Sequence, residues 1–264
     1  MKIIRTAGLE VPELEVYTRL NERQVKTIFE PDAGIFICES KRVIDRALSA
    51  GYEPLSAFCE ESCLPDVQEL AGQYDIPVYV AAYNEMRAMT GYSLTGGILM
   101  AMRRKALPDA EEIMRSCSRI VVLDDVENPT NVGAIFRSAA ALGAEAVLLT
   151  AGSADPLYRR AARVSMGSVF LIKWTFADET MMEKLKANGF ETYALALSDH
   201  AQMLGELATG SSKQAIILGN EDHGISGDIL SSCDHCVMIP MQNGVDSLNV
   251  AAASAVAFWE IFGI

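Results

Sequence analysis

The chain has 264 residues, of which 50% are hydrophobic and 22% charged, a composition that suits one large globular domain or two small ones and excludes a disordered chain. The longest strongly apolar run, at residues 249–259, is short and rich in Ala and Ser, so no membrane-spanning helix is predicted. Residues 1–6 contain no apolar signal segment, so we expect a cytoplasmic protein whose six cysteines stay reduced.

The net charge of −13 is distributed unevenly along the chain. Residues 1–106 carry 12 Lys and Arg against 15 Asp and Glu, whereas residues 107–264 carry 10 against 20. Because phosphate contacts supply much of the affinity for nucleic acids, the first half is the better candidate for a nucleic-acid-binding surface. Its basic residues form three clusters, each of which alone fits an ordinary solvated face: Arg19/Arg23/Lys26, Lys41/Arg42/Arg46 and Arg103/Arg104/Lys105.

Strands and helices are predicted to alternate along residues 1–106. Acidic and apolar residues alternate at helical spacing over residues 9–28, which predicts one or two short helices. Apolar runs predict strands at 34–39, 54–60, 78–81 and 97–102, with helices at 41–50, 64–74 and 84–89 between them. Ser40 is the predicted N-cap of the helix at 41–50. This order predicts a small α/β sandwich domain over residues 1–106.

A change of composition around a proline predicts a linker at residues 107–117. Apolar runs then predict buried parallel strands at 119–124, 146–149, 168–172, 192–197, 214–219 and 237–240. Helices are predicted at 132–142, 158–166, 178–187 and 247–262, the last capped by Asp246 or Ser247. Residues 118–264 are therefore predicted to form a doubly wound α/β domain with ligand-binding loops at the carboxyl ends of its strands.

Several common kinds of site are not supported by the sequence. No G-x-G-x-x-G follows the first strand of either half, and neither a P-loop nor a G-x-S-x-G elbow is present. The three histidines show no metal-ligand spacing, and the pairs Cys59/Cys63 and Cys233/Cys236 fit no standard zinc pattern. A standard dinucleotide or nucleotide site, a hydrolase and a metalloenzyme are therefore all disfavoured.

Three polar segments of the second half follow predicted strands and would meet at one edge of the sheet. The first is Asn131-Val-Gly-Ala-Ile-Phe-Arg137. Asn131 lies where a loop enters a helix, so it is nearly as well explained as a helix cap. Arg137 lies in an apolar run, and an arginine on a mostly buried helix needs an anionic partner, for which Glu221 is a candidate.

The second segment is Gly219-Asn-Glu221-Asp-His-Gly224, in which Gly219 would let a ligand approach the backbone and Glu221 supplies a carboxylate. The third, Ile239-Pro-Met-Gln-Asn-Gly-Val-Asp-Ser247-Leu248-Asn249, leads into a helix of small apolar residues that another backbone can approach closely. Each segment alone is a weak signal. Together they predict one ligand-binding crevice.

In order and spacing, these three segments resemble the signature motifs of the SpoU (TrmH-type) RNA ribose methyltransferases. The stretch Asp155-Pro-Leu-Tyr-Arg-Arg-Ala-Ala-Arg-Val-Ser-Met-Gly167 is similar to the family's segment between the first two motifs. Residues 1–106 resemble the ribosomal-protein-like RNA substrate-binding domain that precedes many members. The resemblance implies that residues 118–264 are a parallel-sheet domain with a C-terminal trefoil knot that binds S-adenosyl-L-methionine without a metal, and that the protein is a homodimer.

The resemblance also implies roles for particular residues. Contacts with the cofactor, mainly through backbone groups, fall to Gly219, Ile239 and Leu248. Activation of the ribose hydroxyl falls to Arg137. Because a guanidinium group does not act as a base in proteins, we interpret this as phosphate binding and stabilisation of a developing alkoxide. Four polar residues would position Arg137 and the ribose: Asn131, Glu221, Ser247 and Asn249.

The implied reaction is methyl transfer to a ribose 2′-hydroxyl of structured RNA, more in keeping with rRNA than with tRNA for a two-domain chain. The main alternative is a catalytically silent RNA-binding or ribosome-assembly factor on the same fold. A knotted methyltransferase that acts on a base or a protein is a third reading, which the form of the closing motif disfavours.

Overall fold

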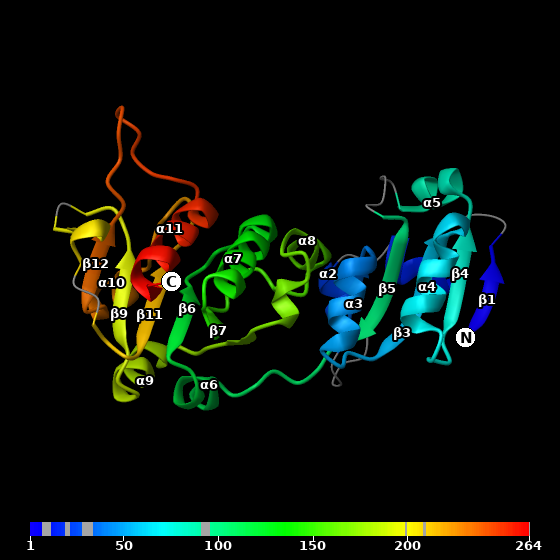
Figure 1. Cartoon of the computed structure of the whole chain (residues 1–264), viewed down its shortest axis with the longest axis horizontal. Helices are drawn as coiled ribbons and strands as arrows, with labels where there is room; N and C mark the ends of the chain where they lie inside the picture. The colour runs from blue at the N-terminus through cyan, green and yellow to red at the C-terminus, as the bar shows by residue number, and fades with distance from the viewer. Residues whose placement is uncertain are drawn as a thin grey trace. The chain divides into compact units, whose positions relative to one another are not determined.

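The computed structural model describes residues 1–6, 12–18, 22–27, 34–90, 96–198, 200–207 and 210–263. They divide into two compact units, each of which is built from two stretches of chain (Figure 1). The first unit comprises Met1–Ala106 and Leu157–Phe170, and the second comprises Leu107–Pro156 and Leu171–Ile264. Residues 107–117, where a linker was expected, contain helix α6, and its Ile113 and Met114 are buried in the core of the second unit.

Within the described ranges, five strands of the first unit form one mixed sheet in the order β1-β4-β3-β5-β2. β1, β4 and β3 are parallel, while β5 runs antiparallel to both β3 and β2. The elements have these bounds: β1 Lys2–Arg5, α1 Glu15–Thr18, α2 Glu22–Thr27, β2 Ile35–Glu39, α3 Lys41–Ser49, β3 Pro54–Glu60, α4 Leu64–Ala71, β4 Pro77–Ala81, α5 Tyr83–Thr90, β5 Ile98–Arg103 and α8 Arg159–Val164.

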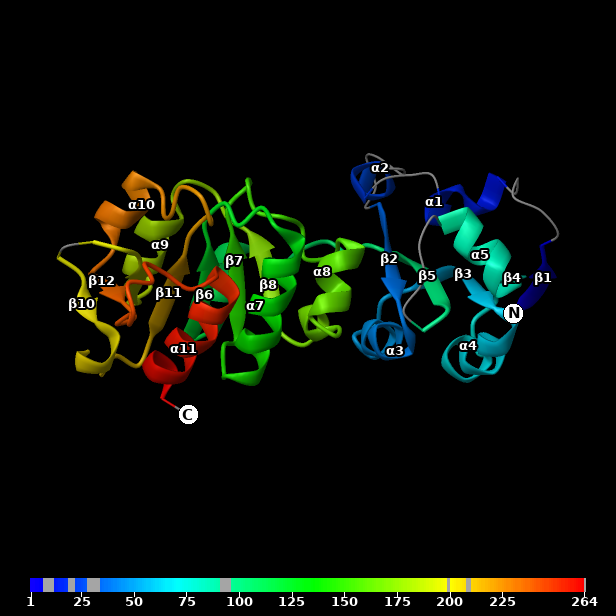
Figure 2. The same ribbon diagram turned by 90° about the horizontal axis from the view of Figure 1, so that it is seen from above.

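Helices cover both faces of this sheet, with α3 and α4 on one side and α1, α2 and α5 on the other (Figure 2). Side chains alternate across the strands, so each face has its own apolar layer. On the side of α1, Tyr17 packs against Phe58, with ring centroids 5.9 Å apart, and Leu14 and Leu99 join the same cluster. The small α/β sandwich predicted from the sequence is confirmed.

Ser40 is the N-cap of α3, as predicted, but its side chain makes no capping hydrogen bond; its φ is 82° and its backbone amide donates to Ile98 O (3.1 Å). One prediction for this unit is wrong. The apolar run at 168–172 is not a strand. Phe170 instead lies beside Phe36 and Tyr52, at centroid distances of 5.9 and 5.3 Å, and thereby joins the first unit.

In the described part of the second unit, seven strands, all parallel, form a sheet in the order β10-β12-β9-β11-β6-β7-β8. The bounds are β6 Arg119–Leu123, α7 Pro129–Ala141, β7 Ala146–Leu149, β8 Lys173–Phe176, α9 Met181–Ala187, β9 Glu191–Leu195, β10 Gln202–Met203, β11 Gln214–Leu218, α10 Gly227–Ser232, β12 His235–Met238 and α11 Val250–Phe262, with α6 at Ala110–Ser116. No helix among the described residues is long and apolar enough to cross a membrane.

This sheet also has helices on both faces, with α7 and α11 on one and α9 and α10 on the other (Figure 2). α6 packs with α9 in the same apolar cluster. β12 lies beside β9 and β10, yet α11, which follows it in the chain, packs against β11 and α7. The segment between β12 and α11 therefore carries the chain back across the sheet. Gln214 holds the end of α11 in place by donating a hydrogen bond to Ile261 O (3.0 Å).

The two helices that carry site residues begin at other residues than predicted. α7 begins at Pro129, because Asn128 caps it by accepting a hydrogen bond from Thr130 N (2.9 Å). Asn131 is therefore inside the first turn. α11 begins at Val250 with Asn249 as its N-cap, so neither Asp246 nor Ser247 has that role.

Candidate active site

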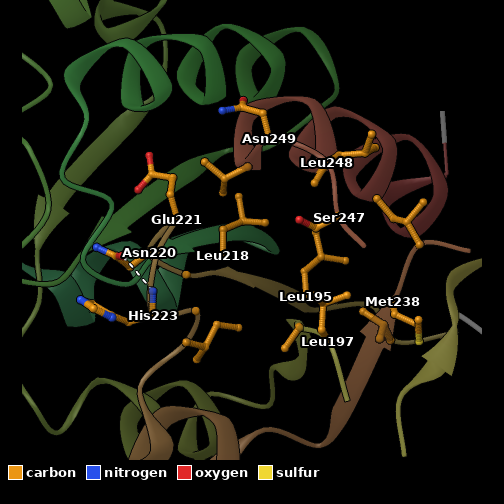
Figure 3. A pocket seen from close by; sticks show the side chains of 18 of the residues that line it. Leu195, Leu197, Leu218, Asn220, Glu221, His223, Met238, Ser247, Leu248 and Asn249 are labelled. Atoms are coloured by element: carbon orange, nitrogen blue, oxygen red, sulfur yellow. Dashed lines mark hydrogen bonds between the residues drawn. The ribbon is translucent and has the colours of Figure 1, made fainter. Parts of the chain in front are cut away.

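A cleft of about 580 Å³ opens at the carboxyl ends of β9, β11 and β12 (Figure 3). Its walls are largely apolar, with Leu195 ending β9, Leu197 following it and Leu218 ending β11. A volume of a few hundred Å³ and apolar walls with a few polar groups are typical of pockets for small organic ligands. All six predicted site residues from the second and third motifs line this cleft: Gly219, Glu221, Ile239, Ser247, Leu248 and Asn249.

A chain of hydrogen bonds joins the three motifs at one side of the cleft. Asn249 Nδ2 donates to Asn131 Oδ1 (3.2 Å), and Asn131 Nδ2 in turn donates to Glu221 Oε1. Asn249 Oδ1 also accepts from Ala251 N (3.0 Å), so the residue that orients Asn131 is fixed by the start of α11. Figure 3 shows Glu221 and Asn249 on the same side of the cleft, toward α7. The motifs thus converge as the sequence predicts, through amide and carboxylate groups.

The backbone at Gly219 comes very close to the chain that returns after Glu221. A Cβ atom at Gly219 would lie 2.3 Å from Gly224 C and 2.4 Å from Ile225 N. Asn220 and Gly224 exchange two backbone hydrogen bonds of 3.0 Å, which close the turn between them. Glycine at 219 is therefore required by the packing of this turn.

Arg137 was predicted to pair with an anionic group, and no such pair is present among the described residues. It is exposed on α7, and it has no hydrogen bond or ion pair with any residue in the described part of the chain. Six residues separate it from Asn131, which places it about 9 Å along the helix and on another side. Glu221, the anionic partner proposed for Arg137, bonds to Asn131 instead. Within one chain, Arg137 does not line the cleft.

Leu195 and Leu197, which form the wall at the end of β9, belong to none of the three motifs. The available signal was position, since β9 is the neighbour of β11 and its carboxyl end opens on the same edge. The contacts made by Asn220, which stands between Gly219 and Glu221, have no signal in the sequence.

Most of the basic residues in the first unit's clusters already have partners within the chain. Lys41 contacts Asp66 (2.8 Å) and Glu69 (2.7 Å), and Lys105 donates to Ala50 O (2.7 Å). Arg42 is exposed on α3 and makes no such contact with the described residues. Arg19 lies outside the described residues. Exposed ion pairs are worth little in water, so phosphate groups would be able to replace these carboxylates.

Residues 118–259 match the SpoU rRNA Methylase family. The chain belongs to this family. It is 34% identical over 253 residues to an uncharacterized tRNA/rRNA methyltransferase of Mycobacterium bovis, with 94% of this chain and 88% of that protein covered. It is 28% identical over 209 residues to the 23S rRNA (guanosine-2′-O-)-methyltransferase RlmB of Acinetobacter baylyi, with 76% and 84% covered.

The similarity of fold to a solved structure extends over both units. The crystal structure of an AdoMet-bound rRNA methyltransferase from Sinorhizobium meliloti superposes with a TM-score of 0.82 at 21% identity, covering 98% of this chain and 97% of that one. This confirms the predicted fold class, a small α/β unit and a parallel-sheet unit with a C-terminal trefoil knot. Membership of the family also confirms the predicted enzyme class and cofactor, an S-adenosyl-L-methionine-dependent RNA 2′-O-ribose methyltransferase.

Proposed function

We propose that this enzyme methylates a ribose 2′-hydroxyl of structured rRNA, in preference to tRNA, at the cleft described above. The observation that carries the proposal is the hydrogen-bonded chain from Asn249 through Asn131 to Glu221, which brings all three family motifs to one edge of one cleft. The preference for rRNA is supported by relatives named as 23S rRNA methyltransferases, RlmB of Acinetobacter baylyi and RlmP of Bacillus subtilis.

The residues of the cleft fit S-adenosyl-L-methionine. Leu195, Leu218 and Leu248 provide apolar surface for an adenine ring, and Gly219 and Ile239, which also line the cleft, would bind the cofactor through their backbone groups. The cleft volume of about 580 Å³ lies within the usual range for ligands of this size. When bound, the cofactor supplies a methyl group that its sulfonium already activates for attack by a nucleophile.

The protein must then orient the ribose hydroxyl and take its proton while the new O–C bond forms and the S–C bond breaks. Glu221 Oε1 accepts from Asn131, whereas Oε2 has no hydrogen-bond partner among the described residues. We assign to Oε2 the acceptance of the hydroxyl proton. Ser247, at the rim of the same cleft, would hydrogen-bond the ribose. Arg137 would bind the adjacent phosphate and the developing negative charge.

The position of Arg137 fits a homodimer. α11 leaves apolar side chains exposed, with Val256 42% and Trp259 57% accessible in the single chain. Large exposed aromatic residues are typical of interfaces between proteins. α11 packs against α7, which carries Arg137, so a second copy seated on α11 would lie next to α7 as well. We propose that this contact gives Arg137 access to RNA at the dimer interface.

The remaining assignments are also proposals. Residues 1–106 would act as the RNA substrate-binding domain and residues 118–264 as the catalytic domain, and the protein would work in the cytoplasm together with its substrate. Because the chain carries a charge of −13, RNA would be gripped by local basic groups such as Arg42, and binding should weaken steeply with salt.

The test is transfer of labelled methyl from S-adenosyl-L-methionine to total RNA from cells that lack this gene, separated into rRNA and tRNA. Wild type should label one rRNA species, and Arg137→Ala should label it at least about 100-fold more slowly. Arg115→Ala, at an exposed arginine on α6, is the matched control and should behave as wild type. Label in tRNA would refute the rRNA assignment. RNA binding without label would support the silent RNA-binding alternative.

A further inference from the structure

Asn220 makes more contacts than its place beside Glu221 suggests. Its Nδ2 donates to Asp125 O (2.8 Å), and its Oδ1 accepts from Asp222 N (2.8 Å) and His223 N (3.2 Å). One side chain therefore satisfies the two backbone amides that follow Glu221 and also ties their turn to the loop after β6. Figure 3 shows Asn220 beside Glu221 and His223.

The anchor on the other side is itself held firmly. Asp125 has a φ of 53°, which is uncommon for a residue with a side chain, and this conformation is held by Thr150. Asp125 N donates to Thr150 Oγ1 (2.8 Å), and Thr150 Oγ1 donates back to Asp125 Oδ1 (2.6 Å). The carbonyl that Asn220 binds is thus fixed in direction by the end of β7.

The far end of the turn is tied to the same loop. Ser226 N donates to Asp124 Oδ2 (2.7 Å), and Asp124 is 3% exposed. The segment that carries Glu221 is consequently fastened before and after the glutamate, once by a side-chain amide and once by a backbone amide. The hydrogen bond from Asn220 to Asp125 O lies next to Glu221. It can be removed by truncating the partly buried Asn220 side chain.

We propose that Asn220 is a positioning residue for methyl transfer. It fixes the backbone from which Glu221 reaches Asn131, so that the carboxylate meets the ribose hydroxyl in one orientation. The inference rests on the proposed role of Glu221. Reacting groups displaced by about 1 Å lose on the order of 100-fold in rate, so loosening this turn should be visible in the chemical step and less so in the overall fold.

The experiment compares Asn220→Ala and Asn220→Asp with Asn188→Ala in the full-length protein. Asn188 provides the matched control, because its Nδ2 also donates to a backbone carbonyl, Lys184 O (2.9 Å), at the end of α9. Two quantities are measured: the single-turnover rate of methyl transfer with saturating cofactor and RNA, and hydrogen exchange of the Asp222 and His223 amides.

Asn220→Ala should lower the rate about 10-fold or more and speed exchange of both amides, whereas Asn188→Ala should change neither. Asn220→Asp keeps an oxygen for the two amides and loses the donor to Asp125 O. It should therefore protect the amides as wild type does, and its rate should stay low.

A double-mutant cycle with Glu221→Gln separates positioning from general damage. If Asn220 acts through Glu221, adding Asn220→Ala to Glu221→Gln should slow the reaction by less than about twofold more. The proposal is overturned if wild type is active and the rate losses of Asn220→Ala and Glu221→Gln multiply in the double variant. It is equally overturned if Asn220→Ala leaves the rate, or the exchange of the two amides, unchanged. A wild type that transfers no methyl would overturn the proposed function and this inference together.

Discussion

Gly219→Ala should damage the cofactor cleft through one methyl group. The new Cβ would lie 2.3 Å from Gly224 C, 2.4 Å from Ile225 N and 2.5 Å from Gly224 O. Ordinary van der Waals contacts begin near 3.4 Å, so the backbone would have to separate by about 1 Å. No side chain can rotate away to relieve the clash, since all three atoms belong to the backbone. The turn that holds Glu221 would therefore move.

Overpacking of this kind costs about 1–3 kcal/mol. Because about 1.4 kcal/mol corresponds to a factor of ten, the dissociation constant for S-adenosyl-L-methionine should rise by about 5- to 150-fold if the clash is relieved only by opening the cleft. Titration calorimetry with the cofactor measures this change directly. Thermal unfolding measured on the same samples shows how much of the cost falls on the fold.

Gly227→Ala is the matched control. A Cβ there meets nothing within 4 Å, and Gly227 is the first residue of α10, where alanine should be neutral or slightly stabilising. Binding by Gly219→Ala with wild-type affinity and wild-type stability would refute the reasoning, because the clash would then have been absorbed without moving the cleft.

Three further changes test other parts of the structure. Trp259→Glu should convert the proposed homodimer to monomers in light scattering, since loss of a central tryptophan weakens interfaces by about 2 kcal/mol or more; wild type that is already monomeric would contradict the dimer. Asp109→Ala removes the N-cap of α6, which bonds two backbone amides at 2.9 and 3.1 Å, and should lower the melting temperature by about 2–4 °C. Burial tends to raise the pKa of Asp234, but hydrogen bonds from the Thr192 hydroxyl and amide outweigh it and hold this pKa below its usual value. The stabilisation by Asp234 is therefore present above about pH 4 and lost as pH falls further, so the difference in melting temperature between wild type and Asp234→Asn should shrink as the pH falls below about 4.

Local hydrophobic patterns predicted the strands of both sheets well. They failed for an apolar segment that could pack in the core of either unit. The run at 168–172 has the hydrophobicity of a buried strand, but Phe170 packs beside Phe36 and Tyr52 of the first unit, and the strand β8 follows at Lys173–Phe176. The sequence of this segment does not indicate in which of the two hydrophobic cores it is buried. Conversely, α6 had a detectable signal in Asp109 and in the spacing of Ile113 and Met114, which the nearby proline obscured.

The candidate site shows the same limit. Motif spacing predicted that Glu221 and Asn131 would converge, because both follow parallel strands whose carboxyl ends share an edge. It did not predict that Glu221 would bind Asn131 and not Arg137. That choice depends on the angle between side chains on α7, which turns Asn131 toward the cleft and Arg137 toward solvent.

The most direct test of the central claim is the position of the transferred methyl group. RNA labelled by the wild-type enzyme is digested to nucleosides for mass spectrometry, and a parallel sample is hydrolysed in alkali. A methyl on the ribose should appear as a 2′-O-methylnucleoside and should block alkaline cleavage at its 3′ side. A methyl found on a base, with cleavage undiminished, would contradict the assignment of this cleft to ribose methylation.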